Sequence, residues 1–172
     1  MDEILIDEET IQKRITELAD ELYETYGDEK VVFICTLKGA VFFTCDLLKK
    51  YKGRAFVDFL RVSSYDGDHS TGKVSLNLSV SEESIKGQNV IIMEDIVDTG
   101  RSIDFLYDYI GKMSPKTLTT CTLLYKEEKS TVKNKPDYVG FKIDDLFVIG
   151  YGLDYNQEYR NLPYIKVLKN SR

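Results

Sequence analysis

The sequence has little of the chemistry that binds zinc or forms disulfides. It contains one histidine, three cysteines and no Cys-x-x-Cys pair in 172 residues. Structural zinc needs closely spaced cysteine and histidine ligands, so a zinc site is not expected. Cys35, Cys45 and Cys121 are odd in number and lie in apolar segments. This usage is typical of reduced core thiols in the cytosol, so we expect a cytoplasmic protein without a disulfide framework.

Long apolar runs are also missing, and no stretch approaches the length of a membrane span. The acidic start Met1-Asp2-Glu3 argues against a secretory signal, so we expect no membrane partner. No repeat, low-complexity tract or linker divides the chain. We therefore expect one domain over residues 1–172, which is long enough to bury a hydrophobic core.

Basic residues are outnumbered by acidic ones, 23 to 29, which gives a formal net charge of −6. This charge gives the chain no general electrostatic footprint for nucleic acid, so no nucleic-acid partner is expected. A substrate with several phosphates would meet a repulsive far field. It would need amides, lysines, arginines or a divalent metal at short range. The composition therefore favours metal assistance for any polyphosphate chemistry.

The most informative segment covers residues 90–102. Four apolar residues at 90–93 predict a strand buried on both faces, as in a parallel sheet, and Glu94 and Asp95 end that strand. The loop Asp-Thr-Gly-Arg-Ser follows at 98–102. Apolar residues with helical spacing come next, at Ile103, Leu106, Tyr107, Ile110 and Met113.

Acids at the end of a strand, followed by small residues that open a helix, are typical of a site for a phosphorylated sugar. The helix start offers unpaired amides and a positive dipole to the phosphate. Gly100 lets the backbone approach closely, and Thr99 and Ser102 add hydroxyl donors. Glu94 and Asp95 can accept hydrogen bonds from sugar hydroxyls. The glycine spacings of a Walker loop and of a dinucleotide fingerprint are both absent.

Apolar periodicity predicts alternating helices and strands elsewhere. Helices are expected at 8–26, with Asp7 as N-cap and Gly27 as stop, and near 40–51. Strands are expected at 31–35, 54–62, 74–80, 117–125, 138–141 and 146–149. This order predicts a doubly wound α/β fold, whose ligands bind outside the carboxyl ends of the strands. The polar segment 63–73 is compatible with a mobile lid or with a long hairpin loop.

Four separated segments make nearly the whole chain resemble the hypoxanthine-guanine phosphoribosyltransferases, which are type I phosphoribosyltransferases. The segments are Leu37-Lys38-Gly39-Ala40, Ser64-Tyr65, residues 90–102, and Lys126 together with the tail at 147–160. The resemblance implies a mostly parallel sheet flanked by helices, a small hood region and a mobile lid loop. It also implies a backbone turn before Gly39, often cis. Gly152 departs from relatives that carry alanine there, and Ala40 from those with a second glycine.

The resemblance implies an activity in purine salvage. The 5-phosphoribosyl group of phosphoribosyl pyrophosphate would be transferred to hypoxanthine or guanine, with Mg²⁺ as cofactor and a homodimer or homotetramer as the assembly. Ribose and 5-phosphate would be bound by Glu94, Asp95, Asp98, Thr99, Gly100, Arg101 and Ser102. Pyrophosphate would be bound by Lys38, Gly39, Ser64, Tyr65 and Arg160. The purine would contact Lys126, Phe147, Val148 and Asp154, and the metal Glu94, Asp95 and Asp154.

Individual roles at the purine follow from the same resemblance. Asp98 would be the general base at the imidazole ring of the purine. Lys126 would donate to the six-oxo group and so select oxo-purines over adenine, although its charged neighbours alone favour a solvated surface lysine. Phe147 would stack on the base while the Val148 carbonyl reads its edge, although Phe147 alone favours a core position.

Two alternatives stay open. One is a transferase of the same type that prefers xanthine, because Lys126 and the tail argue less firmly against xanthine than against adenine or orotate. The other is an RNA-binding regulator of a pyrimidine operon on the same fold. That alternative needs a basic RNA-binding face, which the net charge of −6 disfavours.

Overall fold

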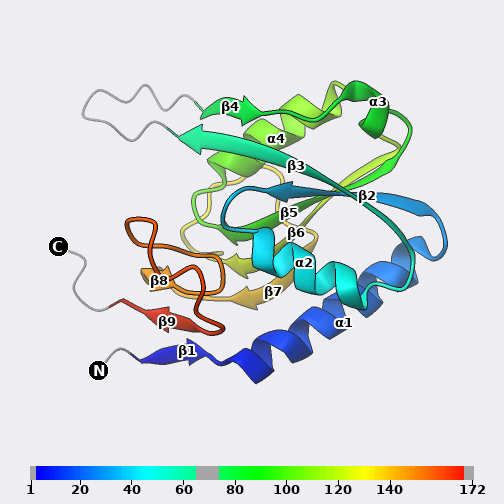
Figure 1. The fold of residues 1–172 in the computed structure, drawn as a ribbon. Coiled ribbons are helices and arrows are strands. Elements are labelled where there is room, and N and C mark those ends of the chain that lie inside the picture. The colour runs from blue at the N-terminus through cyan, green and yellow to red at the C-terminus, as the bar shows by residue number, and fades with distance from the viewer. Residues whose placement is uncertain (1–2, 65–73, 169–172) are drawn as a thin grey trace.

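The computed structural model describes residues 3–64 and 74–168. Strands and helices alternate over most of this length (Figure 1). The helices are α1 (Glu8–Tyr26), α2 (Val41–Lys50), α3 (Glu82–Ile85) and α4 (Arg101–Gly111). The strands are β1 (Ile4–Ile6), β2 (Lys30–Thr36), β3 (Arg54–Ser64), β4 (Val74–Leu78), β5 (Asn89–Val97), β6 (Thr117–Tyr125), β7 (Tyr138–Lys142), β8 (Val148–Ile149) and β9 (Ile165–Val167). None of the helices in the described ranges is long and apolar enough to cross a membrane.

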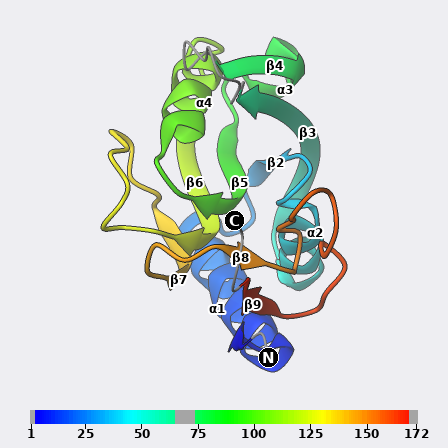
Figure 2. The ribbon, with the colours of Figure 1, turned by 90° about the vertical axis from the view of Figure 1, so that its left-hand side faces the viewer.

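The larger sheet has six strands in the order β4-β3-β2-β5-β6-β7. Its strands are parallel except at one edge, where β4 runs antiparallel to β3. The parallel strands run toward the left in Figure 1, so their carboxyl ends face the viewer in Figure 2. The predicted α/β fold with a mostly parallel sheet is confirmed.

The sheet separates two hydrophobic cores, and the alternation of side chains along each strand supplies both. In β5, Ile91 and Met93 join the core under α1 and α2, whereas Val90 and Ile92 join the core under α4. Strand β2 likewise contributes alternate side chains to the two cores. This arrangement explains why these strands are continuously apolar, and it confirms the prediction that the motif strand is buried on both faces.

Helix α1 begins and ends where its sequence predicts. The Asp7 carboxylate accepts a hydrogen bond from the Thr10 amide at 2.8 Å, which caps the first turn. Gly27 ends the helix with a φ of 53°. The buried face of α1 packs on the sheet through Ile11, Ile15, Leu18, Ala19 and Leu22.

A second, three-stranded sheet has the order β1-β9-β8, and we call it the hood. The sequence prediction missed β1, β9 and the short helix α3, and the strand expected at 146–149 covers only Val148–Ile149. Strands of two or three residues are too short to show a periodic pattern, because alternation needs four or more positions to be visible. The hood packs against the α1 and α2 side of the molecule through Ile6, Val148 and Ile165.

The predicted lid at 63–73 begins within the described part of the chain. Residues 63 and 64 end β3, but Tyr65 and the rest of the segment, including His69, lie outside the described residues. The lid therefore stays a prediction.

Candidate active site

The loops that follow β2 and β5 meet beside the hood at the carboxyl ends of the central strands of the large sheet. Cys35 lies opposite Met93 in the parallel register, so Thr36, which ends β2, lies beside Glu94 of β5. A cavity of about 540 Å³ opens there. The predicted site residues among its lining are Lys38, Gly39, Glu94, Asp95, Asp98, Thr99, Gly100, Arg101, Ser102, Asp154 and Arg160.

Two adjacent carboxylates lie at the base of this cavity. Glu94 is buried, and its Oε2 accepts a hydrogen bond from the Thr36 hydroxyl at 2.9 Å. Its Oε1 is buried with no hydrogen-bond partner among the described residues. Burial, followed by the neighbouring charge of Asp95, raises the pKa of Glu94. Burial also raises the pKa of Asp95, although the Ile96 amide and the Arg160 charge act in the opposite direction. The pair is thus suited to a ligand that brings hydrogen-bond donors or positive charge.

The loop after β2 has no room for side chains where it meets the acid pair. A Cβ on Gly39 would overlap the Asp95 carboxylate, and a Cβ on Gly152 would overlap the Gly39 carbonyl. The cis peptide bond lies between Leu37 and Lys38, one residue earlier than the bond immediately before Gly39. Three distant segments are therefore in close contact here, and the observed backbone has no space for alanine at position 152.

The loop after β5 turns directly into α4. Gly100 has a φ of 89° and lies against the Val132 side chain, so a Cβ at this position would meet both strain and steric overlap. The first residues of α4 line the cavity, where amides of the first helical turn have no intrahelical partner. This is the anion-binding geometry expected for a sugar phosphate.

The loop at 150–160 contributes Asp154, Gln157 and the cation Arg160 to the cavity lining. Arg160 pairs with Asp154 at 2.9 Å and donates to the Gly152 carbonyl at 2.6 Å. Lys38 donates to the side-chain oxygen of Gln157 at 3.0 Å, and the Gln157 amide donates to Asp154 at 2.8 Å. The sequence analysis did not single out Gln157, because a glutamine in a polar loop carries no signal of its own. Its backbone adopts a φ of 69°, a conformation that only the folded loop reveals.

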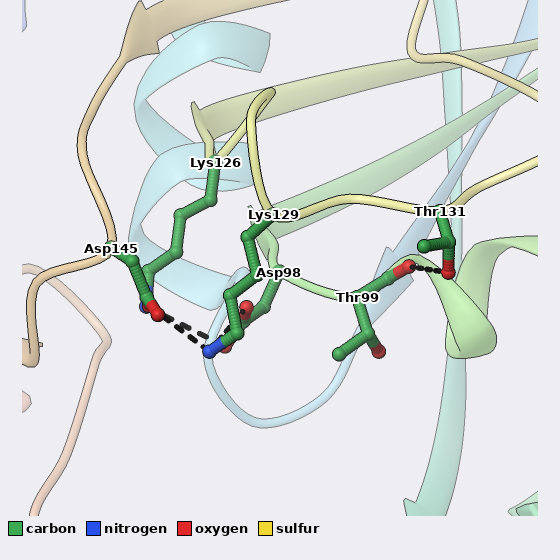
Figure 3. Close-up of polar contacts among 6 residues, drawn as sticks. All are labelled: Asp98, Thr99, Lys126, Lys129, Thr131 and Asp145. Atoms are coloured by element: carbon green, nitrogen blue, oxygen red, sulfur yellow. Dashed lines mark hydrogen bonds and ion pairs between the residues drawn. The ribbon is translucent and has the colours of Figure 1, made fainter.

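Among the residues predicted to contact the purine, Lys126 is only 6% exposed, so its reading as a solvated surface lysine is wrong. Its Nζ lies 3.0 Å from Asp145 Oδ1 and 3.5 Å from Asp98 Oδ2 (Figure 3). Lys129 reaches the same two carboxylates, at 3.0 Å from Asp145 and 3.1 Å from Asp98. The sequence analysis gave no role to Lys129 or Asp145, because local spacing does not indicate that the loops after β6 and β7 meet.

The remaining predicted purine residues lie in or beside the hood. Phe147 is 45% exposed and meets Tyr155 edge to face, so its reading as a core residue is wrong. Val148 is buried in β8. Of the predicted lid residues, Ser64 ends β3 and Tyr65 lies outside the described ranges.

The acid pair and Asp154 have the chemistry for Mg²⁺, which prefers oxygen ligands. Glu94 Oε1 lacks a partner, and Asp154 is close enough to raise the pKa of Asp95. Within residues 3–64 and 74–168, however, no three acidic, histidine or cysteine side chains are grouped closely enough to hold a metal ion. Mg²⁺ in such sites commonly binds one or two carboxylates and takes its other ligands from substrate phosphates and water. The residues therefore fit a metal that arrives together with its substrate.

Comparisons with known proteins agree with this geometry. A family model described as a phosphoribosyl transferase domain matches residues 2–156. The hypoxanthine-guanine-xanthine phosphoribosyltransferase of Tritrichomonas foetus is 42% identical over 99% of this chain and 93% of its own length. The hypoxanthine-guanine phosphoribosyltransferase of Bacillus subtilis (strain 168) is 41% identical over 98% and 94%. A crystal structure of a hypoxanthine-guanine phosphoribosyltransferase from Bacillus anthracis superposes with a TM-score of 0.92 at 40% identity, covering 97% of this chain and 98% of that one. The chain therefore belongs to the phosphoribosyltransferase family.

Proposed function

We propose that this protein is a purine salvage enzyme that transfers the 5-phosphoribosyl group of phosphoribosyl pyrophosphate to hypoxanthine or guanine and releases pyrophosphate. One observation carries the proposal: a buried lysine, Lys126, lies beside Asp98 at the edge of a cavity that also holds the acid pair and the start of α4. A carboxylate and a buried cation beside a cavity with the chemistry for a sugar phosphate support an oxo-purine acceptor. The names of the relatives above support the same activity.

The proposed role of each site residue follows from its position. Glu94 and Asp95 would bind the ribose hydroxyls, and their negative charge would favour the cationic sugar that develops as the bond to pyrophosphate breaks. Asp98 would accept the proton of the purine imidazole ring. Lys126 would donate to the six-oxo group, and the exposed ring of Phe147 would stack on the purine.

The leaving group would be held from the opposite side. Lys38 and Arg160 would supply charge-assisted hydrogen bonds, and Gly39 would offer its backbone amide. Lys38 contacts Gln157 and Arg160 contacts Asp154, and all four residues line the cavity. Asp154 with Glu94 and Asp95 would hold Mg²⁺, which supplies charge neutralisation to the departing pyrophosphate. We also propose, on the resemblance, a homodimer or homotetramer and a cytoplasmic location.

A spectrophotometric assay with phosphoribosyl pyrophosphate, Mg²⁺ and one purine at a time tests the proposal. We expect turnover with hypoxanthine or guanine, and none with adenine, because Lys126 would face an amino group instead of an oxygen. Turnover confined to xanthine would favour the first alternative. RNA retention in a filter-binding assay, without purine turnover, would favour the regulator.

Lys126→Gln should weaken the use of purine far more than the use of phosphoribosyl pyrophosphate. A hydrogen bond to a charged group contributes about 1.5–3 kcal/mol, so the KM for hypoxanthine should rise roughly 10- to 100-fold. Initial rates with each substrate varied in turn would separate the two KM values, and a thermal melt would check that the variant folds. An equal loss for both substrates would contradict the purine-binding role.

A further inference from the structure

The purine end of the site holds a second lysine that the proposed reaction leaves without a role. Lys129 lies in the loop after β6, and Asp145 lies between β7 and β8. The Lys129 ammonium is 3.1 Å from Asp98 Oδ1, 3.4 Å from Asp98 Oδ2 and 3.0 Å from Asp145 Oδ1 (Figure 3). Lys129 is thus shared between the proposed proton acceptor and a carboxylate farther from the cavity.

The backbone around Lys129 is anchored on both sides. The Lys126 amide donates to the Val97 carbonyl at 3.0 Å, and the Thr131 amide donates to the Thr99 carbonyl at 3.1 Å. The Thr131 hydroxyl also reaches the Thr99 carbonyl, as Figure 3 shows. Val97 ends β5 and Thr99 lies in the loop that carries Asp98, so these bonds flank Asp98 and join the two loops. Motion at this point therefore belongs to the long Lys129 side chain, which is 38% exposed, and not to its backbone.

Two cations approach Asp98, and the Lys129 ammonium lies close to both of its oxygens. Lys126, Lys129, Asp98 and Asp145 carry two positive and two negative formal charges, which cancel. Lys126 and Lys129 both donate to Asp98 Oδ2, at 3.5 Å and 3.4 Å. The Lys129 ammonium also lies 3.1 Å from Oδ1, a buried oxygen that has no hydrogen-bond partner among the described residues. A carboxylate that accepts a proton from a purine needs an oxygen facing the ring. Lys126 is itself required by the purine oxygen in the proposed function, so Lys129 is the cation that can be displaced.

We propose that Lys129 is a positioning residue for the acceptor base: it covers Asp98 until the purine enters, and Asp145 alone then holds it. The inference rests on the proposed function, which makes Asp98 the proton acceptor. Asp145 already contacts Lys129 at 3.0 Å, so the release needs a small rotation of the side chain and no new partner. A purine must compete with Lys129 for Asp98, and the apparent affinity for the purine is lowered accordingly.

Lys129→Met should remove this competition while keeping a side chain of similar length. Partly exposed ion pairs of this kind are weak, so the KM for hypoxanthine should fall by only about two- to fivefold. The KM for phosphoribosyl pyrophosphate should not change. Lys129→Arg, which keeps the charge, should behave as the wild type. Lys133→Met is the matched control, because Lys133 is an exposed lysine a few residues along the same stretch of chain and should leave both KM values unchanged.

Asp145→Asn tests the other half of the proposal. Without the Asp145 charge, Lys129 keeps only Asp98, so the KM for hypoxanthine should rise in the wild-type background. Asp145 also contacts Lys126, so the loss of its charge can change the KM for hypoxanthine through either lysine. The same substitution is therefore also made in the Lys129→Met variant, where only the effect through Lys126 persists. The rise should be larger when Lys129 is present.

Two results would overturn the inference alone: equal KM values for hypoxanthine in Lys129→Met and Lys133→Met, or an equal effect of Asp145→Asn in both backgrounds. Both presuppose a wild-type protein that uses hypoxanthine or guanine. A wild-type protein without any purine turnover would instead overturn the proposed function, and this inference with it.

Discussion

Removing divalent metal with excess chelator should abolish turnover, and Mg²⁺ should restore it. The chain has a formal net charge of −6, and its acid pair lies at the base of the cavity that would receive a pyrophosphate. Phosphoribosyl pyrophosphate adds further negative charge at close range, where solvent screening is weak. Without metal, the cavity's own cations, which are Lys38, Arg61, Arg101 and Arg160, must offset the substrate phosphates together with Glu94, Asp95 and Asp154.

The measurement is the initial rate of nucleotide formation, first in chelator and then after graded addition of Mg²⁺. A thermal melt in chelator is the control, because a lost rate should not come with a lost fold. Full activity in excess chelator would contradict the role of metal at the leaving group.

Asp98→Asn should lower kcat by roughly 10²–10⁴-fold, the usual contribution of a general acid or base, with a smaller effect on KM. Asparagine keeps the shape of the side chain and can still accept a hydrogen bond from Lys126 or Lys129, so the surrounding contacts should persist. It cannot accept the purine proton. Asp108→Asn, at an exposed position of α4, is the matched control for loss of one negative charge.

Steady-state kinetics with hypoxanthine would give both constants for each variant. A wild-type kcat for Asp98→Asn would mean that water or another residue takes the proton. An equal loss in Asp108→Asn would point to a general effect of charge rather than to catalysis.

The phosphate side of the site was predictable because its signals are local. The apolar run of β5, the acids at its end and the small residues that open α4 are consecutive in the chain, and one strand-loop-helix unit places them together. The continuous apolar pattern also identified a strand buried on both faces, which requires helices on either side of the sheet. One short stretch of sequence therefore predicted both the phosphate-binding chemistry and the type of sheet.

The purine side was less predictable, because its contacts join distant loops. Nothing near Lys126 indicates that Asp145 will neutralise it, so its charged neighbours favoured the wrong surface position. Phe147 shows the opposite error: it reads as a core residue, but the hood leaves it half exposed beside Tyr155. The roles of the individual site residues and the lid stay predictions.

Gly152 follows the hood strand β8 and is in close contact with Gly39, which in turn contacts Asp95. The position of the hood therefore affects the position of the site backbone. The Gly39 backbone lies between Gly152, in the loop after β8, and the Asp95 carboxylate, and neither contact leaves room for a methyl group on the glycine. A shift of the hood toward the sheet would push the Gly39 peptide, and that peptide would in turn press on Asp95. Distortion far out in the tail would therefore be transmitted to the sugar as a change in alignment, even if every side chain that touches the substrate were left intact.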